Sequence, residues 1–190
     1  MKNSIKVWDP LVRVFHWTLV LSFAVAWLTG DEWDSVHFWA GYTIASLVAF
    51  RVVWGVIGTR HARFTDFIYR ISTVKSYLLS LLTLKPKHYT GHNPAGGLMV
   101  LVLLVSLAVL TFTGMASIAA DGEGPLAGTW IASMSGEWTE DIHEGFANVV
   151  LAMVFFHVAG VVVSSLVHGE NLVRAMFTGR KSVEVNQHEK

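Results

Sequence analysis

The regularly spaced histidines of this chain are its strongest candidates for functional residues, because imidazole can bind metals and exchange protons. His143 and His157 are 14 residues apart, and Arg51 follows His37 at the same distance. In an α-helix, 14 residues make about four turns and ~21 Å of rise, so both members of such a pair lie on nearly the same face. One helix that carries His143 and His157 would therefore present two imidazoles at two levels.

Four apolar stretches are long enough to hold these residues inside a membrane. They cover residues 11–29, 36–57, 95–119 and 142–167. About 20 helical residues cross roughly 30 Å of hydrocarbon, and a backbone in lipid must satisfy its polar groups within the segment. We therefore expect an all-α fold, an integral membrane four-helix bundle that forms a single domain over residues 1–181. We predict that residues 182–190 form a polar tail.

Composition supports a membrane protein and excludes several other classes. Of the 190 residues 53% are apolar and 15% are charged, and the mean hydropathy is +0.48. The 14 basic residues are balanced by 14 acidic ones, which leaves no net charge for binding nucleic acid. The absence of Cys excludes disulfides, Cys-ligated iron–sulfur clusters and thioether-attached haem.

The distribution of charge predicts the orientation. Basic residues precede the first stretch, connect the second to the third and follow the fourth, so we expect both termini of this multi-pass membrane protein to be cytoplasmic. The opposite loops are acidic and contain Asp31, Glu32, Asp34, Asp121, Glu123, Glu137, Glu140 and Asp141. Residues 72–84 predict an interfacial helix on the cytoplasmic surface, and residues 115–141 predict an outer cap.

The antiparallel order of the stretches assigns each histidine a depth. His16 is near the cytoplasmic start of the first stretch and so matches His157, whereas His37 is at the outer start of the second and matches His143. Two facing imidazoles at each of two depths are what two six-coordinate haems require. The alternative is a set of histidines hydrogen-bonded between helices. A single metal ion is disfavoured because the two levels are ~21 Å apart.

Other basic residues have two interpretations each. Arg51, at the depth of the cytoplasmic pair, and Arg13 would bind haem propionates by charge-assisted hydrogen bonds, or their side chains extend to the lipid headgroups. We expect His92 and His168, at the cytoplasmic rim, to cap helix ends or to bond to propionates, with proton exchange as the alternative.

Several segments resemble one family. They are Trp8-Asp9-Pro10-Leu11-Val12-Arg13-Val14-Phe15-His16-Trp17, His37 with Gly41 and Arg51, Gly91-His92-Asn93-Pro94, His143-Glu144 with Ala147-Asn148 and His157, and His168-Gly169-Glu170-Asn171-Leu172-Val173-Arg174-Ala175-Met176. From about residue 7 to 179 the chain resembles the bacterial cytochrome b561 and nickel-iron hydrogenase b-type subunit superfamily.

The resemblance implies a four-helix cytochrome of the bacterial inner membrane with two haem b groups. It implies that electrons pass between a quinone pool and a partner redox protein. It also implies one haem ligand from the first helix, one from the second and two from the fourth, which coincide with His16, His37, His143 and His157.

Three classes of function are compatible with a membrane protein that carries these histidines. With both axial positions filled, no iron site is open to O₂, which favours an electron-transfer subunit without catalytic residues of its own. A superoxide:quinone oxidoreductase is the second class, but its anionic substrate would be steered by positive charge. The acidic outer loops instead suit a cationic partner such as a c-type cytochrome, or an oxidoreductase subunit. A haem-free transporter or membrane anchor is the third class.

Overall fold

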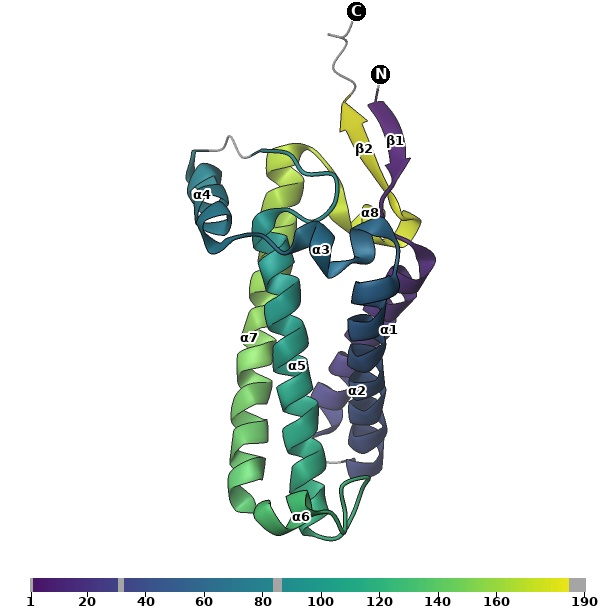
Figure 1. The fold of residues 1–190 in the computed structure, drawn as a ribbon, viewed down its shortest axis with the longest axis vertical. Helices are drawn as coiled ribbons and strands as arrows, with labels where there is room; N and C mark the ends of the chain where they lie inside the picture. The colour runs from purple at the N-terminus through teal and green to yellow at the C-terminus, as the bar shows by residue number, and fades with distance from the viewer. Residues whose placement is uncertain (1, 31–32, 84–86, 185–190) are drawn as a thin grey trace, which may run out of the picture. The chain divides into compact units, whose positions relative to one another are not determined.

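The computed structural model describes residues 2–30, 33–83 and 87–184 (Figure 1). Four helices are long and apolar enough to cross a membrane: α1 (Pro10–Thr29), α2 (Asp34–Ile57), α5 (Pro94–Ala120) and α7 (Glu137–His168). Shorter elements are the 3-10 helix η1 (Arg60–Ala62) and the helices α3 (Phe64–Phe67), α4 (Ile71–Leu82), α6 (Trp130–Met134) and α8 (Leu172–Thr178). The predicted four-helix membrane architecture is confirmed.

The long helices begin and end close to the predicted positions, with one exception. Helix α7 begins at Glu137, five residues before the apolar stretch that starts at residue 142. Its first turn contains Glu137 and Glu140, and negative side chains stabilise a helix N-terminus. Helix α4 covers most of the segment predicted to form an interfacial helix, and the segment predicted to form an outer cap contains the end of α5, a loop, α6 and the start of α7. Their positions at the membrane surfaces stay predictions.

The start of α1 is fixed by its sequence. Asp9 occupies the position before the first helical residue, and its carboxylate accepts a hydrogen bond from the Val12 backbone N–H at 2.9 Å. Pro10 is the first helical residue, where its missing N–H would have no partner in any case. An aspartate cap followed by proline therefore sets where α1 begins.

Two strands join the ends of the chain. β1 (Lys2–Lys6) pairs antiparallel with β2 (Arg180–Glu184), in a register that places Ser4 opposite Ser182 (Figure 1). The sequence assigned residues 182–190 to a polar tail. Residues 182–184 instead belong to β2, and residues 185–190 lie outside the described part of the chain.

The turn into β2 depends on a glycine. Gly179 has a positive φ of 77°, and a Cβ at this position would lie 2.6 Å from the Trp8 carbonyl oxygen. The Gly179 carbonyl accepts hydrogen bonds from the backbone N–H groups of Val7 and Trp8. Val7 and Trp8 pack with Ala175 of α8 in a buried apolar cluster, which attaches the paired strands to the helices beneath them.

The chain divides into two compact units. The strand-containing unit consists of Met1–His16, Arg51–Leu101 and Phe156–Lys190, and the helical unit consists of Trp17–Phe50 and Val102–Phe155. Phe67 is the most deeply buried large side chain of the strand-containing unit, and Ile44 and Val150 are central to the core of the helical unit. Each unit contains two of the four histidines singled out by the sequence.

Candidate functional site

The strand-containing unit brings two of these histidines together. The rings of His16, from α1, and His157, from α7, have centroids 6.4 Å apart and planes inclined by 51°. The sequence paired these residues by depth, and the structure places them side by side.

The helical unit contains the second pair. The rings of His37, from α2, and His143, from α7, have centroids 6.0 Å apart and are nearly perpendicular, at 84°. Nδ1 of His37 lies 2.9 Å from the Ala26 carbonyl oxygen, and Nδ1 of His143 lies 2.9 Å from the Leu110 carbonyl oxygen. Because a carbonyl only accepts, each Nδ1 carries the proton and donates it. Nε2 of each neutral ring is then left with a lone pair for a metal.

A glycine makes room for the His143 ring. A Cβ at Gly114 of α5 would lie 2.8 Å from Cε1 and 3.0 Å from Nδ1 of His143. The same ring bonds to the carbonyl of Leu110, four residues earlier in α5. Within the helical unit α5 and α7 run side by side (Figure 1), and this close approach fixes the imidazole against α5.

In each pair, the two rings are spaced as they would be if both bound the same metal ion. Metal bonds to imidazole nitrogen are about 2.0–2.1 Å long, so two rings on opposite sides of one ion have centroids roughly 6 Å apart. The observed 6.4 Å and 6.0 Å agree with this spacing. Among the described residues, no group of three or more His, Cys, Asp or Glu is arranged to hold a metal. The spacing of each pair therefore fits a haem iron held by two imidazoles.

Arg51 is buried rather than extended toward the surface. The residue is 2% exposed, and its guanidinium lies over the rings of Phe64 and Phe67 at 5.2 and 5.7 Å from their centroids. Nη1 is buried and has no hydrogen-bond partner among the described residues. A buried cation of this kind calls for an anion, because desolvating an unpaired charge costs several kcal/mol.

Arg13 is directed toward the C-terminal part of the chain. Its Nη1 donates a hydrogen bond of 2.5 Å to the Phe177 carbonyl in the last turn of α8. Cations at a helix C-terminus interact favourably with its free carbonyls. The structure thus shows Arg13 fastening α1 to α8, and contact with a propionate remains a prediction.

Asp9 connects α1 to the end of α2. Its second carboxylate oxygen accepts hydrogen bonds from the Thr59 hydroxyl at 2.6 Å and from Trp54 Nε1 at 3.2 Å. Burial by itself would raise the pKa of Asp9, but these two bonds and the one from Val12 lower the pKa below its usual value. Asp9 is therefore an ionised residue that holds the N-terminus of α1 in place.

His92 lies in the segment before α5, enclosed by aromatic rings. Its ring is 4.6 Å from those of Trp8 and Phe67, between centroids, and its Nδ1 is buried without a described partner. Burial, followed by the positive charge of Arg51, lowers the pKa of His92 to about 3. His92 is consequently neutral at physiological pH.

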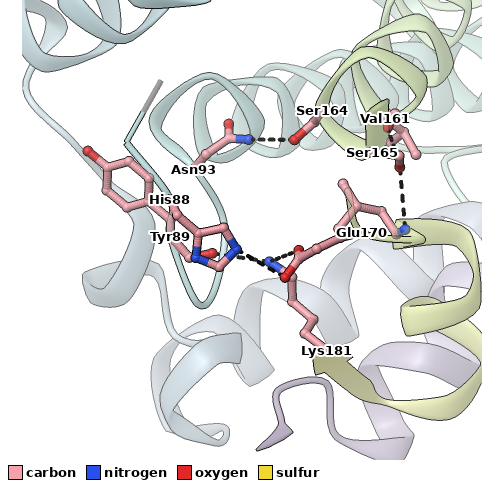
Figure 2. Close-up of polar contacts among 9 residues, drawn as sticks. His88, Tyr89, Asn93, Val161, Ser164, Ser165, Glu170 and Lys181 are labelled. Atoms are coloured by element: carbon pink, nitrogen blue, oxygen red, sulfur yellow. Dashed lines mark hydrogen bonds and ion pairs between the residues drawn. The ribbon is translucent and has the colours of Figure 1, made fainter. Parts of the chain in front are cut away.

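The other histidines that the structure describes in this unit contact acidic or aromatic neighbours. His61 bonds to Asp66 at 2.8 Å. Figure 2 shows Glu170 between His88 and Lys181, with oxygen–nitrogen distances of 3.0 and 3.2 Å, and Lys181 also donates to the Tyr89 carbonyl. The His168 ring lies 5.3 Å from that of His88. These contacts tie β2 to the segment between α4 and α5.

The acidic residues for which the sequence predicts an outer position are exposed where the structure describes them. Glu137, Glu140 and Asp141 in the first turns of α7 are exposed, and the described part of the helical unit contains no ion pair. Trp33, Trp39, Trp130 and Trp138 are exposed in the same unit, as expected for side chains at a membrane interface. Asp31 and Glu32 lie outside the described residues.

Some functional residues were missed by the sequence analysis. The acceptors for His37 and His143 are backbone carbonyls, whose role no residue type reveals. Gly114 is one small residue among many in α5. Asp9 had a usable signal, since aspartate followed by proline at the start of an apolar stretch is a typical helix beginning.

Comparisons with known proteins point to one family. Residues 7–179 match the family described as prokaryotic cytochrome b561. The chain is 28% identical to a probable Ni/Fe-hydrogenase B-type cytochrome subunit of Azotobacter chroococcum mcd 1, over 94% of this chain and 88% of the relative. It is 29% identical to the protein of the same name from Azotobacter vinelandii, with the same shares covered. The protein of that name from Rhizobium leguminosarum bv. viciae is 25% identical over 95% of this chain and 90% of its own length. No solved structure matches the chain.

Proposed function

The chain belongs to the prokaryotic cytochrome b561 family, as a multi-pass bacterial membrane protein of electron transfer that carries haem b, and from this premise we propose that it holds two haems. His16 and His157 hold one, and His37 and His143 hold the other. The single observation that carries the proposal is the spacing of the two imidazole pairs, 6.4 and 6.0 Å between centroids. Bound haem supplies an iron that accepts and releases one electron.

The residues of the chain support electron transfer as the function of this site. His16 with His157 and His37 with His143 would each hold one haem iron, and an iron held by two imidazoles would have no open position for O₂. Hydrogen bonds from Nδ1 of His37 and His143 to backbone carbonyls orient the rings and keep Nε2 available. The chain therefore acts as an electron carrier between other redox partners.

We infer that these partners are a quinone in the bacterial inner membrane and a redox protein. The relatives are named as hydrogenase cytochrome subunits, which makes a hydrogenase the first candidate for the protein partner. The exposed acidic side chains of the helical unit also suit a cationic partner such as a c-type cytochrome. They disfavour a superoxide:quinone oxidoreductase, whose anionic substrate they would repel.

Single His→Ala substitutions at positions 16, 37, 143 and 157 test the proposal. Each variant should lose or loosen one of two haems, because one axial ligand is missing. His88→Ala is the matched control, since His88 bonds to Glu170 outside either pair. Haem per chain is measured by the pyridine haemochrome assay. Two low-spin haems retained in all four variants would contradict the assignment.

The expected orientation has a simple test, because the chain contains no Cys. A single cysteine introduced at Ser4 should react with a membrane-impermeant maleimide only after the cells are opened. One introduced at Ser133 of α6 should react in intact spheroplasts. The reverse pattern would place the termini outside.

A further inference from the structure

Arg51 and His92 share one aromatic neighbour in the strand-containing unit. Phe67, 1% exposed, lies under the Arg51 guanidinium at 5.7 Å and against the His92 ring at 4.6 Å, both measured to its centroid. The two side chains come from different segments, α2 and the loop before α5. A single buried ring thus brings a cation and a neutral imidazole into one neighbourhood.

Each of these side chains has a buried nitrogen without a described partner. These atoms are Nη1 of Arg51 and Nδ1 of His92. Native proteins pair nearly all their buried polar groups, so two such atoms beside the same ring indicate a missing acceptor. A guanidinium and an imidazole N–H are both donors, and the acceptor that satisfies them together is an anion.

The carboxylates of this unit that lie nearby already have partners. Asp9 accepts from Val12, Trp54 and Thr59, and Asp66 is bonded to His61 and paired with Arg60 at 3.7 Å. Arg51 interacts with Asp9 electrostatically but forms no described ion pair with it. The anion must therefore come from outside the described chain.

We propose that Arg51 and His92 form one carboxylate site, and that it is occupied by a propionate of the haem held between His16 and His157. All four residues belong to the same compact unit, and His157 is near enough to His92 to influence it electrostatically. The guanidinium neutralises the carboxylate and the imidazole donates a second hydrogen bond. This inference rests on the proposed function, because it requires a haem at that pair.

Redox titration of the purified holoprotein tests the cationic half of the site. Arg51→Gln should lower the midpoint potential of one haem and leave the other unchanged, because losing a nearby cation disfavours the added electron. Arg51→Lys, which keeps the charge but not the planar fork, should restore part of the shift. Arg60→Gln is the matched control, because Arg60 has a side chain 86% exposed and should leave both potentials unchanged.

Infrared difference spectra between oxidised and reduced protein identify the anion. Protein carrying haem with ¹³C-labelled propionate carboxylates should show carboxylate bands that move on labelling. Those bands should shift in Arg51→Gln and in His92→Phe, which keeps a ring against Trp8 and Phe67. Label-sensitive bands that are identical in wild type and both variants would overturn the proposal and point to a free anion or a lipid phosphate instead.

Loss of haem from a variant also tests whether Arg51 binds the propionate through its charge. Haem lost from Arg51→Gln but kept by Arg51→Lys supports a charge-dependent anchor. Haem lost from both variants, with the labelled bands of His92→Phe unchanged, overturns it. Failure of the proposed function is distinguishable, because wild-type protein would then lack two haems before any variant is compared.

Discussion

At the scale of single residues, Asp9 joins three segments through one carboxylate. It caps α1 through Val12 and accepts from Trp54 and Thr59 at the other oxygen. Asp9→Ala should lower the free energy of unfolding by roughly 2–4 kcal/mol, because a cap is lost and two donors lose a charged acceptor. Asp9→Asn, which keeps a capping oxygen, should cost less. Denaturation in sodium dodecyl sulfate, followed by circular dichroism, measures both; equal stability of Asp9→Ala and wild type would contradict the expected role.

The same residue predicts a dependence on pH. Burial disfavours the ionised form of Asp9, but the hydrogen bonds from Thr59, Val12 and Trp54 favour it more, so folding lowers the pKa of Asp9 below 3.8, its unfolded value. Its contribution to stability is therefore complete above pH 3.8 and is lost as the pH falls through the lower folded value. The stability difference between wild type and Asp9→Asn should shrink below about pH 4. A difference that stayed constant from pH 7 to pH 3 would show that the charge is not involved.

The four histidines were predictable at this scale, whereas most of their surroundings were not. Imidazoles are rare inside apolar stretches, and a 14-residue spacing gives His143 and His157 the same face of one helix, so their pairing with His37 and His16 followed from helix direction alone. The orientation of the His37 and His143 rings depends on the backbone carbonyls of Ala26 and Leu110. Because every residue has such a carbonyl, the sequence does not distinguish these two. The cause of the ring orientation becomes visible only when the helices are in place.

At the scale of elements, the approach of α5 to α7 depends on Gly114. In Gly114→Ala the new methyl group would lie 2.8 Å from His143 Cε1, so the ring must move and its bond to Leu110 must weaken. Overpacking of this kind costs about 1–3 kcal/mol. We expect one of two low-spin haem signals to shift or broaden in the electron paramagnetic resonance spectrum.

Gly136→Ala is the control for this prediction. A Cβ at Gly136 has its nearest neighbour, Trp138 Cδ1, at 4.0 Å, which is ordinary contact. This variant should leave both signals unchanged. Identical spectra for wild type and Gly114→Ala would mean that the His143 ring has more freedom than its contacts suggest.

Helices and strands differed in how well the sequence predicted them. The membrane helices follow from long apolar runs, because in lipid such a run has few alternatives to a helix. The start of α7 was missed because its first turn is polar and was counted with the loop. β1 and β2 were missed because two five-residue polar strands at opposite ends of the chain have no local signal. Their pairing depends on a turn at Gly179 and on packing around Trp8.

At the scale of the whole molecule, the net charge of zero conceals an uneven distribution. Basic residues are concentrated in the segments assigned to the cytoplasm, while the exposed first turns of α7 carry Glu137, Glu140 and Asp141. Orientation in the membrane is set by Lys and Arg, and acidic residues contribute little to it. The acidic cluster therefore has a role in solubility, in docking, or in both.

If the acidic residues dock a cationic partner, the rate of electron transfer should depend on salt concentration. If they only keep the segment soluble, it should not. Attraction between exposed charges reaches about 30 Å at 0.01 M salt and about 8 Å at 0.15 M, so electron transfer to a cationic c-type cytochrome should slow as salt rises. Replacing Glu137 and Glu140 by Gln and Asp141 by Asn should lower the low-salt rate in stopped-flow measurements and flatten the salt dependence. The rate with a neutral small oxidant should not change, and neither should the haem spectra. If wild type and the triple variant react equally fast at both salt concentrations, these acidic residues do not steer the partner. The basic segments, for which the sequence predicts a cytoplasmic position, would then become the surface on which a redox partner should be sought.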